Sequence, residues 1–241
     1  MAVLSVKLTV HVSVRRVQTM ISREQDGSAH ILRMQNGQNT IDLEFLAALN
    51  EQLDAVEKET SDCAGAVVLT GEGKFFSNGL NLEFMTNATP DEQKLFGKNM
   101  LGTIRRLILF PLPVVAALNG HAFAAGCFLA LACDFRIQRE DRGWICVSEV
   151  DVGVPIGRPM MGLLTGKVPP QTAREAALTG KRYTAQEAID AGFCDSKAAE
   201  EDLLPKAIEI AQMLATKERT IFQAIKKDLY REVADGFIIR S

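Results

Sequence analysis

The stretch NGHAFAAGCFLALACD, residues 119–134, reads as a tight turn that leads into a helix of small residues. The first N–H groups of a helix have no intrahelical acceptor, and the helix dipole adds partial positive charge there. Small side chains at Ala124, Ala125 and Gly126 let a ligand approach these donors closely. The same side chains also suit tight packing of a helix on a sheet. The stretch therefore predicts either a donor site for a ligand or a close helix–sheet contact.

The segments around this stretch predict an α/β fold. Residues 42–60 have the spacing of one buried helix face, carried by Leu43, Leu46, Leu49, Leu53 and Val56. Strands are predicted over 28–35, 65–71, 112–120 and 135–140, and residues 143–154 are predicted as a strand that runs into a loop. Further helices are predicted over 91–109, 124–132, 158–166, 170–179, 184–191, 203–216 and 218–234. Strands and helices alternate first and helices accumulate last, which indicates an α/β core followed by a helical part.

A second segment with the character of a donor site is GKFFSNGLNLEFM, residues 73–85. Ser77, Asn78 and Gly79 form a turn cluster after a predicted strand, and a glycine at 79 would let the N–H of Leu80 point into a cleft. Taken alone, the segment also fits an ordinary loop. Two donor sites, each after a buried strand, would together hold one oxygen that gains negative charge during a reaction.

The third segment is CVSEVDVGVP, residues 146–155, which contains two acids. A carboxylate among valines is partly desolvated, and this raises its pKa and strengthens it as a base. On an extended chain Glu149 and Asp151 share a face, so spacing alone does not choose between them. Both would also fit ordinary surface acids at the end of a strand.

Composition excludes several classes of function. The chain has 241 residues and a net charge of −3, with no basic face, so nucleic acid is not expected as a partner. The five cysteines and three histidines are scattered and form no metal-ligand pattern, so we expect no metal and a reducing compartment. No apolar run approaches the ~20 residues of a membrane span. Residues 1–19 carry cations and no acids, which leaves open a targeting peptide, a leader or an extra strand.

The three segments together, in this order and spacing, resemble the crotonase superfamily of enoyl-CoA hydratases and isomerases, from about residue 20 to 230. The resemblance implies a spiral of ββα repeats over 20–195 and a helical trimerisation region over 196–241, in trimers or hexamers. It implies a coenzyme A thioester as substrate, with coenzyme A as part of the substrate rather than a cofactor. A cytoplasmic location is expected, with the peroxisome or mitochondrial matrix as alternatives.

The resemblance also assigns residues. It places the oxyanion-hole N–H groups on Leu80 and Ala125 and selects Glu149 over Asp151 as the catalytic base. It implies substrate-binding positions at Ser77, Asn78, Gly79, Asn81 and Phe128.

The departures from the family pattern bear on the reaction. Hydratases carry a glutamate where this chain has Phe128, whereas moving a double bond needs only one carboxylic acid, so the sequence most resembles the Δ3,Δ2-enoyl-CoA isomerases. Hydration, another thioester reaction and a non-catalytic acyl-CoA-binding role are the alternatives. Ala125 stands where glycine is usual, and must accept that backbone geometry with a methyl group. Asn81 stands where aspartate is common.

Two lysines near the C-terminus allow two interpretations. Lys226 and Lys227 lie on a helix that, in relatives, comes near the nucleotide end of coenzyme A. They are expected on a solvated helix face, with phosphate contact as the alternative.

Overall fold

The computed structural model describes residues 20–238, so the expectations for residues 1–19 lie outside the described residues. A six-stranded sheet forms the centre of the molecule, in the order β1-β2-β3-β5-β7-β9. Only β1 runs antiparallel to its neighbour. The strands are β1 (Ile21–Asp26), β2 (Ala29–Met34), β3 (Ala66–Gly71), β5 (Val114–Leu118), β7 (Phe135–Arg139) and β9 (Ser196–Ala198).

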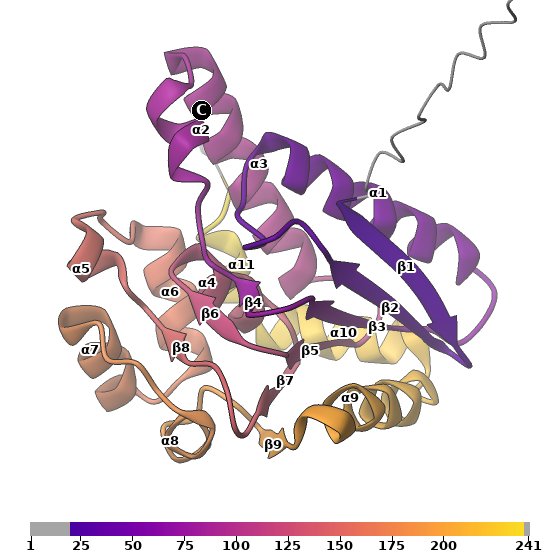
Figure 1. The fold of residues 1–241 in the computed structure, drawn as a ribbon. Coiled ribbons are helices and arrows are strands. Elements are labelled where there is room, and N and C mark those ends of the chain that lie inside the picture. Colours follow the sequence, from indigo (N-terminus) through magenta and orange to yellow (C-terminus); the bar gives the residue numbers. More distant parts are fainter. Residues whose placement is uncertain (1–19, 239–241) are drawn as a thin grey trace, which may run out of the picture.

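Helices cover both faces of this sheet, as the continuously apolar sequences of β3 and β5 require. Val67 and Leu69 face α1 (Leu43–Glu59) and α3 (Pro90–Ile108), whereas Val68, in between, faces α9 (Glu200–Ala215). Figure 1 shows α9 on one side of the sheet, with α1 and α3 on the other. The helix predicted over 42–60 is confirmed as α1, which begins after the N-cap Asp42.

A second sheet of three parallel strands lies beside the first, in the order β4-β6-β8 (Figure 1). Its strands are β4 (Phe75–Ser77), β6 (His121–Phe123) and β8 (Ile145–Cys146). Each follows a strand of the large sheet and precedes a helix: α2 (Leu82–Asn87), α4 (Ala125–Ala132) or α5 (Glu149–Val152). This repeated order of strand, strand and helix confirms the predicted α/β crotonase-like spiral.

Helices dominate the rest of the chain, as predicted. They are α6 (Arg158–Lys167), α7 (Pro170–Thr179), α8 (Ala185–Asp190), α9, α10 (Arg219–Leu229) and α11 (Arg231–Asp235). The helix predicted over 218–234 is divided at Tyr230. The elements that were not predicted are α2 and the strands β1, β4, β6 and β9. The boundary placed at residue 195 falls directly before β9, which pairs with β7. None of the helices in 20–238 is both long and apolar enough to cross a bilayer.

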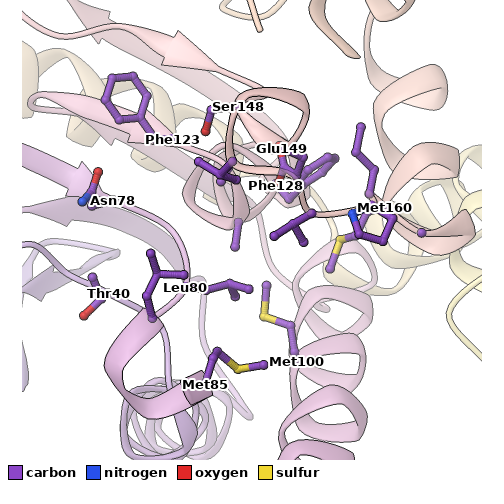
Figure 2. Close-up of a pocket in the computed structure, with 18 of the residues that line it drawn as sticks. Thr40, Asn78, Leu80, Met85, Met100, Phe123, Phe128, Ser148, Glu149 and Met160 are labelled. Carbon is purple, nitrogen blue, oxygen red and sulfur yellow. The ribbon is translucent and has the colours of Figure 1, made fainter. Parts of the chain in front are cut away.

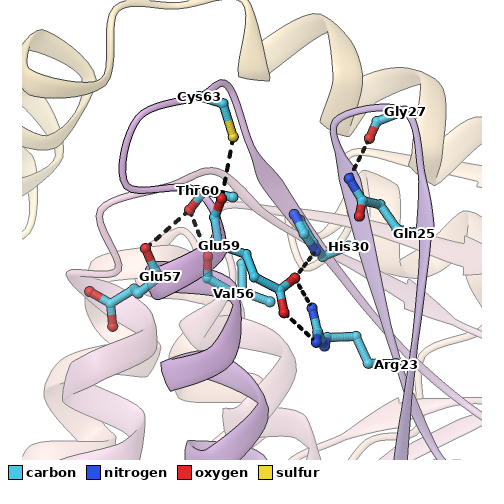
Figure 3. Close-up of polar contacts among 9 residues, drawn as sticks. All are labelled: Arg23, Gln25, Gly27, His30, Val56, Glu57, Glu59, Thr60 and Cys63. Atoms are coloured by element: carbon cyan, nitrogen blue, oxygen red, sulfur yellow. Dashed lines mark hydrogen bonds and ion pairs between the residues drawn. The ribbon is translucent and has the colours of Figure 1, made fainter.

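The outer strand β1 is tied to the end of α1 by charged side chains (Figure 3). Arg23 on β1 binds the Glu59 carboxylate through both guanidinium nitrogens, one of them 2.7 Å from Oε1. His30 on the neighbouring strand is buried, and its Nδ1 lies 4.0 Å from Glu59. Burial, and then the charge of Arg23, lower the pKa of His30, so this histidine is neutral near pH 7. The contact fastens an edge strand and is remote from the site described next.

Candidate active site

A cavity of about 790 Å³ opens between the small sheet and the helices that follow its strands. Its wall is formed by residues from the loops before α1 and α2, from α2 and α3, from the start of α4 and from the α5–α6 region. In Figure 2 the polar Thr40 and Asn78 lie at one end of the cavity, and the apolar Met160 lies at the other. A cavity with a polar end and an apolar end suits a ligand of the same two-part character.

Glu149 is the buried acid in the wall of this cavity. It is the first residue of α5, only 7% exposed, and its Oε2 has no hydrogen-bond partner within residues 20–238. Burial raises the pKa of Glu149 to about 7. An acid that ionises near neutral pH in an apolar wall can both take up and release a proton.

Asp151 is separated from Glu149 by the local backbone. The strand-into-loop prediction for 143–154 is wrong in its second half, because residues 149–152 form a helical turn. On a helix, positions two apart point to different sides. Asp151 is solvent-exposed and its carboxylate lies beside Gly180, where an added Cβ would come within 2.5 Å of Oδ2. The ambiguity between the two acids is thus removed by secondary structure.

The N–H of Leu80 is directed away from the neighbouring strand segment. Ile41 donates its N–H to Gly79 O at 2.8 Å, and Asn81 donates its N–H to Ile41 O at 2.9 Å. Backbone groups alternate in direction along an extended chain, so the N–H of Leu80 points to the opposite side. It has no hydrogen-bond acceptor in the described part of the chain, and Leu80 lines the cavity.

The N–H of Ala125 belongs to the first turn of α4, where helical geometry offers no acceptor. The backbone at Gly79 packs against the start of α4. A Cβ added at Gly79 would be 3.4 Å from Ala125 N and 3.0 Å from Phe123 O. Gly79 has a φ of +89°, which explains the glycine there. The two predicted donors therefore come from adjoining backbone segments at the wall of one cavity.

The glycine-like backbone expected at Ala125 lies one residue earlier. Ala124 has a φ of 48° and a ψ of −123°, a conformation that non-glycine residues rarely adopt, whereas Ala125 is an ordinary helical residue. The next residue, Gly126, explains the close packing: an added Cβ would lie 2.3 Å from Ser77 O. Of the two readings of the opening stretch, close packing is confirmed at Gly126, whereas a donor role for Ala125 stays a prediction.

The expected substrate-binding residues divide into two groups. Asn78 and Phe128 line the cavity, and Asn78 donates to Gln38 Oε1 at 2.7 Å. Ser77, Gly79 and Asn81 are not among the lining residues found within 20–238.

These three residues brace the loop from behind. Ser77 is fully buried, donates to Asn39 O at 2.7 Å and accepts the Gly79 N–H at 3.3 Å. Asn81 caps α2 and donates to Asp42 at 2.8 Å. These three residues support the backbone of Leu80 and do not line the cavity.

Phe128 lies next to Glu149 in the cavity (Figure 2) and is 1% exposed. Glu149 and Asp151 are the only acids in the cavity wall formed by residues 20–238, and Asp151 is directed to Gly180. The space in front of Glu149 is therefore bounded by an aromatic ring rather than by a second carboxylate.

The expectation of a solvated face is wrong for Lys226. This residue is 3% exposed, and its ammonium binds Asp134 at 2.7 Å. Lys227 is exposed, and neither lysine lines the cavity. Of the lining residues that sequence patterns did not indicate, Met100 and Arg182 come from two separate segments, with no shared motif that would have indicated them.

The fold and this cavity define a crotonase-type protein, and comparison with known proteins agrees. The family model described as enoyl-CoA hydratase/isomerase matches residues 24–238. Two enoyl-CoA delta isomerases of Arabidopsis thaliana are similar: number 3 is 35% identical (73% of this chain, 77% of that protein), and peroxisomal number 2 is 32% identical (89% and 93%). The crystal structure of a probable enoyl-CoA hydratase from Mycobacterium tuberculosis superposes with a TM-score of 0.85 at 26% identity, over 90% and 91% of the two chains.

The chain belongs to the enoyl-CoA hydratase/isomerase family, within the crotonase superfamily. The family implies an acyl-CoA substrate and a crotonase-type reaction, either isomerisation or hydration.

Proposed function

We propose that this protein is a Δ3,Δ2-enoyl-CoA isomerase, which converts 3-enoyl-CoA to 2-trans-enoyl-CoA in fatty-acid β-oxidation. The observation that carries the proposal is the single buried carboxylate of Glu149, whose Oε2 has no partner in the described residues, next to Phe128. Adding water to a double bond needs a water molecule held between two carboxylates. Moving a double bond needs one acid that takes a proton and returns it elsewhere.

In the proposed mechanism Glu149 removes a proton from C2 of the substrate. The electrons move onto the thioester oxygen, which the N–H groups of Leu80 and Ala125 hold as an enolate. The Glu149 carboxylic acid then delivers the proton to C4, which leaves the double bond between C2 and C3. A pKa of about 7 suits both halves of this cycle. Each oxyanion donor contributes about 2.7–4 kcal/mol of transition-state stabilisation in comparable enzymes.

The experiment offers the purified protein a 3-enoyl-CoA and follows the ultraviolet absorbance of the conjugated thioester. Glu149→Gln keeps the size of the side chain and removes the base, so kcat is expected to fall about 10²–10⁴-fold. Asp151→Asn tests the neighbouring acid and is expected to change kcat only slightly. Exposed Glu209 on α9 offers a matched control, Glu209→Gln.

Product analysis separates the alternatives. Formation of 3-hydroxyacyl-CoA from a 2-enoyl-CoA, at a rate above that of isomerisation, would make hydration the reaction. Tight acyl-CoA binding with no product of either kind would make the protein a non-catalytic member. Full activity of the Glu149→Gln variant would remove Glu149 from the mechanism.

We also propose a homotrimer, or a hexamer of two trimers. Support comes from α10, where Ile221, Ile225 and Leu229 recur every fourth residue and are 59%, 63% and 67% exposed. An apolar stripe of this kind is typical of a helix that packs against another surface. Light scattering of the purified protein measures the mass, and Ile225→Glu is expected to lower it.

A further inference from the structure

The N–H of Leu80 is a backbone group, so its direction is set by the chain around it and not by the leucine side chain. The donor loop, which we define as residues 77–81, lies against the support loop, residues 36–41. Figure 2 shows Asn78 and Thr40, one residue from each loop, at the same end of the cavity. Three backbone hydrogen bonds join the two loops: Asn78 N–H to Gln38 O at 3.0 Å, Ile41 N–H to Gly79 O at 2.8 Å, and Asn81 N–H to Ile41 O at 2.9 Å. The support loop therefore holds the backbone on both sides of Leu80.

One peptide plane contains both the Gly79 carbonyl and the Leu80 N–H. Because a trans peptide is planar, these two groups point in opposite directions. The Ile41 N–H holds the carbonyl, and the Ser77 hydroxyl accepts the N–H of Gly79 at 3.3 Å. Hydrogen bonds before and after Gly79 thus set the direction in which the Leu80 N–H points.

Asn39 lies within the support loop and is fully buried. Its carbonyl accepts the Ser77 hydroxyl at 2.7 Å. Its side-chain Nδ2 donates to Phe75 O at 3.0 Å, and its Oδ1 accepts the Asn36 N–H at 2.9 Å. Phe75 and Ser77 are the two ends of β4, and the register of β4 with β6 shifts between them. Asn39 therefore holds both ends of a strand that its own sheet pairs irregularly.

The two contacts of Asn39 with β4 have different consequences. At the first end of the strand, Asn119 from the turn before β6 also donates to Phe75 O, at 3.4 Å, so this carbonyl is held from two segments. At the other end, the Ser77 hydroxyl donates to Asn39 O and uses a lone pair to accept the next N–H of the donor loop. The contact with Ser77 is therefore the one that leads on to Leu80.

The backbone of Asn39 is in the left-handed region, with a φ of 51°. Among residues 20–238, the non-glycine residues with a positive φ are Asn39 and Ala124. Ala124 comes directly before Ala125, the second proposed donor, whereas Asn39 contacts the loop that contains Leu80. Strained backbone persists where the surrounding structure enforces it, and it gathers at functional sites. Each proposed donor thus has one such residue beside it.

We propose that Asn39 is a positioning residue, which acts through the Ser77 hydroxyl to hold the Leu80 N–H at the place of the developing oxyanion. The left-handed backbone of Asn39 aims its carbonyl at Ser77, and its side chain fixes that backbone through Asn36 and Phe75. Asn39 is not among the lining residues found within 20–238, so it acts through the donor loop. The inference rests on the proposed function only for the Leu80 donor, and it applies to any thioester reaction in which the oxygen gains negative charge.

Ser77→Ala removes the hydroxyl that connects Asn39 to the donor loop. A misplaced donor loses part of the roughly 10²–10³-fold that a missing donor costs, so kcat for a 3-enoyl-CoA is expected to fall about tenfold. KM is expected to change less than twofold, because the contact acts on charge that develops in the transition state. The pH midpoint of kcat/KM is expected to stay unchanged, since Glu149 is untouched. Asn50→Ala, which removes a hydrogen bond to Thr103 outside the cavity wall, is the matched control for lost stability, and its kcat is expected to change less than twofold.

Two variants of Asn39 separate its backbone from its side chain. Asn39→Gly and Asn39→Ala both remove the amide group, but only glycine adopts a positive φ without strain. Asn39→Gly is expected to lower kcat about tenfold and Asn39→Ala about 100-fold, and circular dichroism verifies that each is folded. The double variant Asn39→Gly/Ser77→Ala is expected to be about as slow as either single variant, because both changes act through one contact. Losses that multiply in the double variant would overturn the connection through Ser77.

Isotope-edited infrared spectroscopy of bound hexanoyl-CoA tests the donors without turnover. Hydrogen bonds weaken a carbonyl bond, and fixed donors in a dry site polarise it more than water does. The thioester stretch is therefore expected at lower frequency on the wild-type protein than in water. Ser77→Ala and Asn39→Gly are expected to return the frequency part of the way, whereas Asn50→Ala leaves it at the wild-type value. A wild-type frequency in the first two variants would overturn the positioning role, as would the absence of a shift in the wild-type protein.

The positioning role and the proposed function fail in different ways. If no isomerisation is found, the infrared frequencies still decide the role of Asn39. If Glu149→Gln abolishes turnover while Ser77→Ala and Asn39→Gly keep the wild-type kcat, the base stands and the positioning role is overturned. A rise in KM in place of a fall in kcat, or an equal fall in Asn50→Ala, would also overturn it, because both indicate a general loosening of the protein.

Discussion

Two buried carboxylates, those of Asp134 and Glu149, differ in what surrounds them. The Asp134 side chain is 8% exposed, binds the Lys226 ammonium at 2.7 Å and accepts the Val114 N–H at 2.8 Å. Glu149 is similarly buried, yet its Oε2 has no partner in the described structure. Burial of a charge is costly unless hydrogen bonds and an opposite charge offset it. The partnered acid therefore fastens the fold, whereas the unpartnered one is available for proton transfer.

The partnered acid connects distant parts of the chain. Asp134 precedes β7 in the core, and Lys226 lies on α10 near the C-terminus. Lys167 on α6 joins the same region: its ammonium donates to Cys133 O at 3.2 Å and lies 3.8 Å from the Tyr230 ring. Burial lowers the pKa of Lys167 to about 7. The C-terminal helices are thereby held to the core through charged side chains.

The largest effect is expected from removing the charge of the partnered acid. Asp134→Asn leaves the Lys226 ammonium buried without a counter-charge, so the free energy of unfolding is expected to fall by about 3–5 kcal/mol. Urea denaturation measures this change. Asp228→Asn breaks an exposed ion pair with Arg231 and serves as the control, with an expected loss below about 1 kcal/mol. Equal losses in the two variants would contradict the role assigned to burial.

Neutralising Glu149 is expected to raise the free energy of unfolding, which is the opposite of the change expected at Asp134. The folded-state pKa of Glu149 is about 7, above its ordinary value of 4.5, because burial favours the neutral form. Its favourable contribution is complete below pH 4.5 and is lost as the pH rises through 7. Glu149→Gln never ionises, so at pH 8 it is expected to be more stable than wild type by about 1–3 kcal/mol. Urea denaturation at pH 8 and pH 4.5 should show the gain only at pH 8.

The same pKa sets the pH dependence of turnover. The base must be ionised, so kcat/KM is expected to fall about tenfold per pH unit below pH 7 and to level off above it. Initial rates with a 3-enoyl-CoA across this range measure the profile, while circular dichroism verifies that the protein stays folded. A midpoint near 4.5 would mean that Glu149 is solvated in the working enzyme.

The smallest effect concerns the backbone beside the cavity. Ala124 has a positive φ, which costs a non-glycine residue on the order of 1–3 kcal/mol. Ala124→Gly is therefore expected to raise the free energy of unfolding by about 1 kcal/mol, after the entropy cost of glycine. In exposed Ala47 on α1 the same change is expected to lower it by about 0.5–1 kcal/mol. Calorimetric Tm values of both variants test the difference in sign.

Local patterns were informative wherever a short stretch carries its own signal. The periodic leucines and the Asp42 cap place α1 within one residue at each end of the predicted 42–60. Small residues at 124–126 indicated the close packing found at Gly126, and they place the N–H of Ala125 in the first turn of α4. Patterns failed at α5, because the alternating valines around Glu149 imitate a strand while the chain forms a single helical turn.

The helix over 42–60, the alternation of strands and helices before a helical C-terminal part, the three motif segments and the phenylalanine at 128 follow from the amino-acid sequence, because each is a local property. The tertiary structure decided which acid of the cavity wall is buried, that Lys226 is committed to Asp134, and that Arg182 joins Phe123 at the cavity wall. These outcomes depend on contacts between residues as many as 92 positions apart. Burial and pairing of a charge are properties of such contacts, and no single stretch of sequence contains them.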